Sequence, residues 1–82
     1  MPGDKKRGLR EMEAAWAINK RSRRNGYYVC LLRYLAGDAS GAREACDASL
    51  AGRCDSGDTP DFCPKLTEEA ERVSALLKAL PK

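Results

Sequence analysis

The chain contains no histidine, and this absence excludes several kinds of active site at once. A Ser-His-Asp triad, a Cys-His dyad and an imidazole metal ligand all require that side chain. The sequence also lacks a Cys-x-x-Cys pair, a glycine-rich phosphate loop and an EF-hand calcium motif. We therefore expect a protein that is not an enzyme and that uses neither a metal ion nor a cofactor.

Long apolar runs are missing as well. No segment approaches the length of a membrane span, so we expect no membrane-spanning helix. The first residues are polar and basic, and no apolar run of the kind found in secretory signals follows them. These two absences predict a cytoplasmic protein.

The length and charge of the chain indicate one small domain with two unlike halves. Eighty-two residues, 43% hydrophobic and 33% charged, suit a single helical domain over 8–82 behind a flexible basic N-terminus over 1–7. Residues 1–33 carry nine Lys and Arg against three acids, whereas residues 34–82 carry six against nine. The basic front half would either dock to an acidic partner or simply keep the ends of the chain solvated.

The strongest structural signal is the apolar segment 27–36. As a helix, it repeats apolar side chains at i, i+3, i+4, i+7 and i+8, which makes one broad apolar face. The same residues would suit a buried strand, but no other segment offers a partner strand with turn signals. We therefore predict a helix at the centre of the fold. Its apolar face comprises Tyr27, Cys30, Leu31, Tyr34 and Leu35.

Turn-forming residues divide the chain into helices around this centre. Asn25 and Gly26 both tolerate the left-handed conformation that ends a helix, so the first helix is predicted over 8–24. Gly37 would end the central helix in the same way, and the third helix would pack beside it as an αα-hairpin. The predicted fold class is all-α, a small bundle of three to four short helices. The predicted hairpin comprises residues 27–36 and 41–52.

A last helix is predicted to begin at Cys63. Its apolar side chains step by four and three residues, which is the spacing of a helix seam. Such a seam packs either on the rest of the chain or on a second copy, and the sequence leaves both open. A homodimer would use Leu66, Val73, Leu77 and Leu80.

The four cysteines suggest two pairs. Cys30 and Cys46 each lie eight residues from Asp38, so a hairpin that turns there brings them face to face. Cys54 and Cys63 bracket an Asp-rich loop. Each pair is either a disulfide or two buried free thiols, and the lack of an export signal favours free thiols. Two further alternatives are a zinc site made by all four thiolates and a nucleophilic Cys63 at a helix N-terminus.

A basic run at 20–24 precedes two tyrosines, a pattern also found on phosphate-binding surfaces with neighbouring aromatic rings. At the end of the predicted first helix, these cations would simply complement the helix dipole. Trp, Tyr and Arg also dominate the energetics of protein interfaces, although Trp16 suits a core position equally well. The candidate partner-binding residues are Trp16, Lys20, Arg21, Arg23, Arg24 and Tyr28.

Together these patterns predict a small non-enzymatic protein-interaction module. It would act as an adaptor or inhibitor of a larger partner that is acidic at the contact. Its size and its lack of catalytic groups are typical of accessory proteins carried by phages or mobile elements. The alternative is a DNA- or RNA-binding regulator that uses the basic run at 20–24, and a third interpretation is a redox- or zinc-dependent helical scaffold.

Overall fold

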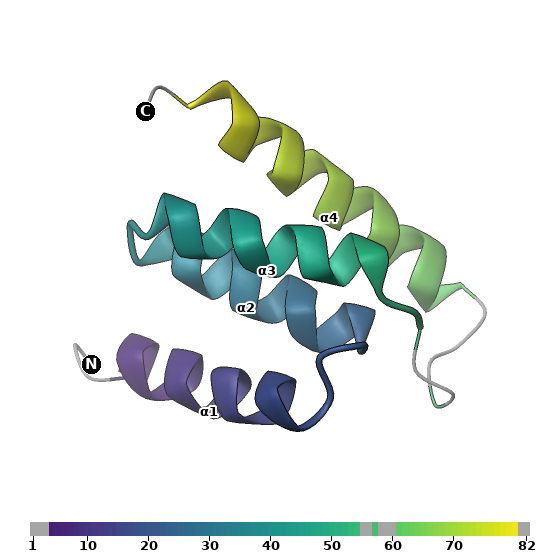
Figure 1. Cartoon of the computed structure of the whole chain (residues 1–82), viewed down its shortest axis with the longest axis horizontal. Coiled ribbons are helices and arrows are strands. Elements are labelled where there is room, and N and C mark those ends of the chain that lie inside the picture. Colours follow the sequence, from purple (N-terminus) through teal and green to yellow (C-terminus); the bar gives the residue numbers. More distant parts are fainter. Residues whose placement is uncertain (1–3, 55–56, 58–60, 81–82) are drawn as a thin grey trace.

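The computed structural model of the chain describes residues 4–54, 57 and 61–80 (Figure 1). Within these ranges the chain forms four α-helices and no strand, which confirms the predicted all-α fold class. The helices are α1 (Asp4–Ile18), α2 (Arg23–Leu35), α3 (Ala39–Ala51) and α4 (Phe62–Ala79).

Helices α2 and α3 form the predicted αα-hairpin. Gly37, with φ of +87°, supplies the left-handed residue after α2. Asp38 caps α3, because its side-chain Oδ1 accepts a hydrogen bond of 2.9 Å from the Gly41 amide. A left-handed glycine followed at once by a helix cap turns the chain sharply, and this places the two helices side by side (Figure 1).

The predicted helix break at Asn25 and Gly26 is wrong, because both residues lie inside α2. Helix α1 ends at Ile18 rather than at residue 24. Ser22 caps α2, with its Oγ accepting a hydrogen bond of 3.1 Å from the Asn25 amide. Gly26 serves close packing instead of a turn: a Cβ there would lie 3.0 Å from the Cβ of Ser49 on α3.

The first helix also begins earlier than the sequence suggested. The prediction assigned residues 1–7 to a flexible N-terminus, whereas α1 includes the backbone from Asp4 onward. Arg7 donates from Nε to Glu11 Oε1 at 3.4 Å, one turn further along the helix. Such pairs give exposed helices modest support, and this one lies in the first turns of α1. Residues 1–3 lie outside the described part of the chain.

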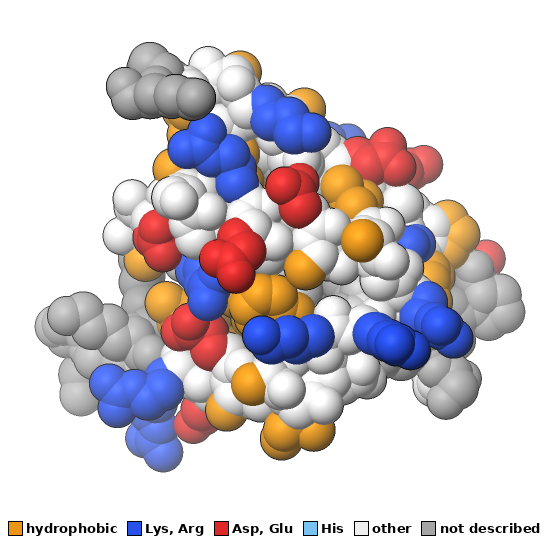
Figure 2. All heavy atoms as spheres, in the orientation of Figure 1, with side chains coloured by type: hydrophobic (Ala, Val, Ile, Leu, Met, Phe, Trp, Pro, Cys, Tyr) orange, Lys and Arg blue, Asp and Glu red, His pale blue; other side chains and the backbone are white. Residues whose placement is uncertain are grey.

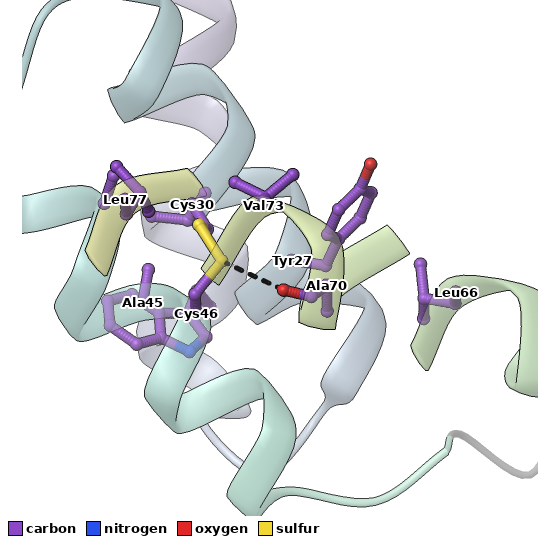
Figure 3. Close-up of a cluster of buried hydrophobic side chains, with 11 residues drawn as sticks. Tyr27, Cys30, Ala45, Cys46, Leu66, Ala70, Val73 and Leu77 are labelled. Atoms are coloured by element: carbon purple, nitrogen blue, oxygen red, sulfur yellow. Dashed lines mark hydrogen bonds between the residues drawn. A yellow bond between two sulfur atoms is a disulfide. The ribbon is translucent and has the colours of Figure 1, made fainter. Parts of the chain in front are cut away.

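Helices α1 and α4 pack on different sides of the hairpin (Figure 1). The backbone of α1 approaches α2, and that of α4 approaches α3 and, to a lesser extent, α2. Within the described ranges, α1 and α4 do not approach each other. The core therefore lies along the hairpin (Figure 3), and its buried apolar residues are Trp16, Tyr27, Val29, Cys30, Ala42, Ala45, Cys46, Leu66, Ala70, Val73 and Leu77.

The leucine seam of α4 belongs to this core. Leu66, Val73 and Leu77 are buried against the hairpin, whereas Leu80 at the end of the seam is 39% exposed. The surface suggested for a homodimer is thus largely occupied by the chain itself. A second copy would have to displace α4 from the hairpin to reach these three side chains.

All four cysteines form disulfides, where the sequence favoured free thiols. Cys30 and Cys46 have Cα atoms 5.1 Å apart across the hairpin, and those of Cys54 and Cys63 are 6.0 Å apart. Both separations fall in the usual range for disulfides. Bonded in this way, the sulfurs are not available as the four thiolates of a zinc site.

Candidate interaction surfaces

Trp16 lies inside the molecule, with only 6% of its surface exposed. Two cations lie against its ring: Lys20 Nζ is 5.4 Å and the Arg33 guanidinium carbon 5.3 Å from the ring centroid. Such cation–π contacts contribute roughly 0.5 to 2 kcal/mol each. The indole Nε1 is buried and has no hydrogen-bond partner among the described residues. Trp16 was predicted either as a contact residue for a partner or as a core residue, and the structure places it in the core.

Arg33 holds three helices together, a role that the sequence did not predict. Its Nη2 donates to Glu13 Oε2 on α1 at 2.8 Å, and its Nη1 donates to the Gly41 carbonyl on α3 at 2.9 Å. One guanidinium thus joins α1, α2 and α3 while lying against Trp16. Nothing in a single arginine near the end of an apolar helix signals this role, because both partners come from other helices.

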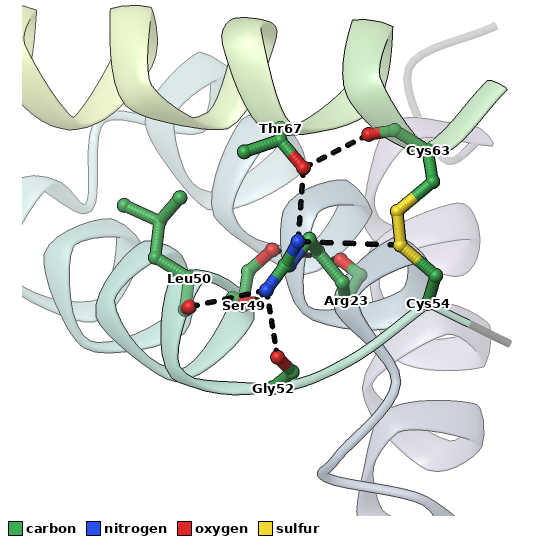
Figure 4. The surroundings of a disulfide bond; sticks show 7 residues. All are labelled: Arg23, Ser49, Leu50, Gly52, Cys54, Cys63 and Thr67. Carbon is green, nitrogen blue, oxygen red and sulfur yellow. Dashed lines mark hydrogen bonds between the residues drawn. A yellow bond between two sulfur atoms is a disulfide. The ribbon is translucent and has the colours of Figure 1, made fainter. Parts of the chain in front are cut away.

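Arg23 is a structural residue and not a free surface cation. It begins α2, so the helix dipole disfavours its charge there, contrary to the predicted position at a helix C-terminus. The end of α3 supplies the compensation. The Arg23 guanidinium donates to the carbonyls of Ser49 at 3.1 Å, Leu50 at 3.4 Å and Gly52 at 2.7 Å. It also donates to Thr67 Oγ1 on α4 at 3.0 Å (Figure 4).

A basic edge forms where α2 starts. An isolated bridge pairs the two backbone segments: Arg53 N donates to the Arg21 carbonyl at 2.8 Å, and Arg23 N donates to the Arg53 carbonyl at 2.9 Å. Arg53 therefore joins the cations of the 20–24 run, although it lies about thirty residues away in the sequence. We define the basic edge as the three exposed cations Lys20, Arg21 and Arg53.

The basic edge was partly foreseeable. In an αα-hairpin the start of the first helix lies beside the end of the second, so residue 53 had to lie near residue 22. Figure 2 shows Lys and Arg side chains gathered at the lower right, over the connection between α1 and α2. Ile18, the most exposed large apolar side chain described, immediately precedes this connection. Arg24 is half-buried and adds its charge to the first turn of α2.

An apolar face covers the outer side of α2 and the adjoining side of α4. Tyr28 and Leu35 on α2 are 36% and 64% exposed, and Leu76 on α4 and Leu80, the residue that caps its C-terminus, are 51% and 39% exposed. Residues seven apart share one side of a helix, as do residues four apart, so each pair forms a stripe. We define the apolar face as these four residues.

Tyr27 lies beside α4 (Figure 3), so the two helices that carry the stripes are neighbours. Burial, then the nearby Glu69 carboxylate, raise the pKa of Tyr27 above its ordinary value of 10.0. Glu69 lies on α4, so this side of α4 faces α2, and Leu76 lies two turns beyond Glu69 on the same side. On α2, the rings of Tyr27 and Tyr28 have centroids 5.7 Å apart.

The structure thus separates the six predicted contact residues. Trp16 and Arg23 are held within the fold, and Arg24 is half-buried in the first turn of α2. Lys20 and Arg21 lie on the basic edge, and Tyr28 lies on the apolar face. Comparison with protein-family models, with curated proteins and with solved structures finds no match to this chain. No helix in the described ranges combines the length and the apolar character needed to cross a membrane.

Proposed function

We propose that this chain is a non-enzymatic protein-interaction module, an adaptor or inhibitor that docks on a larger partner through the apolar face. The observation that carries the proposal is the exposure of Tyr28, Leu35, Leu76 and Leu80 on two neighbouring helices. A chain of this size has few large apolar side chains, and leaving four of them at one surface is typical of a binding site.

The partner's chemistry follows from the residues around the face. Arg24 precedes Tyr28 by one helical turn, and the basic edge lies just beyond it. The surface is therefore apolar toward the end of α2 and basic toward its start. A complementary partner presents an apolar helix or patch with carboxylates at one end, and the charges set its orientation and speed its association.

The compartment of this encounter is best inferred from the cysteines. Disulfides persist chiefly in oxidising compartments, so the two bonded pairs favour such a setting over the cytoplasm expected from the sequence. The interaction itself depends on surface residues and does not require either compartment.

The test compares two doubly charged variants in an affinity purification from the native cell. Leu35→Glu with Leu76→Glu places carboxylates in the apolar face, whereas Ala14→Glu with Ala51→Glu places them at exposed positions elsewhere. We expect the partner to be recovered with the wild type and the control but reduced at least about tenfold with the first variant. Equal recovery with both variants would refute the proposal, and so would turnover of any substrate by the purified chain.

A second candidate function is nucleic-acid binding through the basic edge, because the backbone bridge brings Arg53 beside Arg21. Phosphate contacts of this kind weaken steeply with salt. Arg21→Ala and Arg53→Ala should then each lower the salt dependence of DNA or RNA affinity by about one phosphate contact. A gel shift with no complex at low salt removes this candidate.

A further inference from the structure

The Cys54–Cys63 disulfide lies beside an arginine whose charge is not neutralised by any described carboxylate. Arg23 Nη1 is 4.0 Å from Cys54 Sγ, and both cysteines of the bond are half-buried, within reach of solvent (Figure 4). Among the described residues, the other acceptors of the guanidinium are three backbone carbonyls and the Thr67 hydroxyl, all of them neutral. Of the described groups that this guanidinium contacts, the sulfur is the one that can become an anion, and a partly buried cation stabilises an anion beside it.

Breaking the disulfide would supply that anion. Thiol–disulfide exchange proceeds fastest when the departing sulfur is stabilised as a thiolate. Cys54 would leave next to the full positive charge of Arg23. Cys63, in the first turn of α4, is offered only the partial charge of a helix N-terminus, roughly half a unit. The two sulfurs are therefore unequal, and Cys54 is the better leaving group.

We propose that the Cys54–Cys63 disulfide is an exchange-active site that accepts a thiolate from a small thiol or a protein thiol at Cys63. The incoming thiol first releases its proton to water, and its sulfur then bonds to Cys63 Sγ. The bond between the two cysteine sulfurs breaks, and its electron pair leaves with Cys54 as a thiolate held by Arg23. A second thiol that attacks the mixed disulfide releases Cys63, so that two thiols become one disulfide and the protein gains two thiols.

The Cys30–Cys46 disulfide provides an internal reference. Both of its cysteines are fully buried among apolar side chains, and Cys46 Sγ lies 3.9 Å from the Ala70 carbonyl oxygen, which would repel a thiolate (Figure 3). An attacking thiol cannot reach these sulfurs in the folded chain, and no cation contacts them among the described residues. A thiol should therefore open Cys54–Cys63 much faster than Cys30–Cys46.

The experiment treats the oxidised full-length chain with excess reduced glutathione at neutral pH, quenches it with acid and maps the adducts by peptic digestion and mass spectrometry. We expect the first glutathione on Cys63, and opening of Cys54–Cys63 at least about a hundredfold faster than opening of Cys30–Cys46. A first adduct on Cys54, or two bonds that open together, would overturn the proposal.

Two variants isolate the charge of Arg23. Arg23→Gln keeps a hydrogen-bond donor at the site but removes the charge, and it should slow opening about tenfold. Arg53→Gln removes a nearby exposed charge and controls for general attraction of the anionic glutathione, so its rate should stay within about twofold of the wild type. Equal slowing in both variants would contradict the role of Arg23. If Arg23→Gln fails to fold by circular dichroism, the position of the first adduct on the wild type still decides.

Discussion

The two disulfides lie in opposite surroundings, although each joins residues that are close in the sequence. Cys30–Cys46 is enclosed by apolar side chains between the two hairpin helices. Cys54–Cys63 lies at the periphery, within a polar network built on Arg23. The first bond reinforces packing that burial of apolar surface already favours. The second works together with hydrogen bonds, so one kind of covalent link has two different physical contexts in this small fold.

Removal of the core disulfide should have the largest effect. Replacing Cys30 and Cys46 with Ala opens a link of sequence separation 16 and leaves space where the sulfurs were. We expect the free energy of unfolding to fall by about 3 to 5 kcal/mol, of which about 3 comes from the lost constraint on the unfolded chain. Urea unfolding followed by circular dichroism measures it. A loss below about 1 kcal/mol would show that the hairpin holds without this bond.

Loss of the hydrogen-bond network around Arg23 should have the second largest effect on stability. Arg23→Met removes the hydrogen bonds to three carbonyls and to Thr67 while keeping an unbranched side chain of comparable reach. Carbonyls at the end of α3 then lose their donor, and the expected loss is about 2 to 4 kcal/mol in the same unfolding experiment. Arg53→Met, at an exposed position, should change stability by no more than about 0.5 kcal/mol. Similar losses in both variants would mean that surface charge and not the network matters.

The peripheral disulfide should contribute less than the core one. Cys54→Ser with Cys63→Ser opens a link of sequence separation 9, and the shorter loop implies a loss of about 2 to 3 kcal/mol. Combining this change with Arg23→Met sharpens the comparison. Its effect should not be additive, because Cys54 and Arg23 belong to one network. When Arg23→Met is combined with removal of the core disulfide, the two losses in the free energy of unfolding should be closer to additive. Additive losses at the peripheral disulfide and non-additive losses at the core disulfide would contradict the view that only Cys54–Cys63 belongs to the Arg23 network.

The smallest effect concerns pH at the edge of the apolar core. The pKa of Tyr27 is raised, mainly by burial, so the unfolded chain loses this proton near its ordinary value of 10.0 before the folded chain does. Stability from this group is therefore complete below pH 10 and is lost as the pH rises through the folded value. Tyr27→Phe should flatten the fall in urea midpoint above pH 10, whereas the matched control Tyr28→Phe should not. An identical fall in all three proteins would contradict this assignment.

Local signals predicted the centre of the fold well. The period of the apolar side chains in 27–36, followed by Gly37 and Asp38, was sufficient to predict the hairpin. The hairpin also predicted that Cys30 lies opposite Cys46, because residues equally distant from the turn face each other. What the pattern could not decide was whether these thiols were bonded, since this depends on the redox environment and not on spacing.

The errors share one physical origin. Gly26 suggested a turn because glycine tolerates left-handed conformations. In the structure, the absence of a side chain at Gly26 instead leaves room for Ser49 on α3. Arg23 suggested a surface cation, yet its acceptors come from the end of α3 and from α4. In both cases the deciding neighbour is more than twenty residues away. The apolar face escaped prediction for the same reason, because the exposure of Leu35 and Leu76 depends on where the other helices pack.

Trp16 is also an intrinsic fluorescence probe for the packing of α1 on the hairpin. It is the only tryptophan, and it lies on a helix whose backbone approaches α2 alone among the described helices. If α1 peels away while the cross-linked hairpin stays intact, the indole enters water and its fluorescence emission shifts to longer wavelength, with little change in helical circular dichroism. A red shift that precedes the loss of ellipticity would therefore reveal a partly open species in which the first helix has separated before the rest melts.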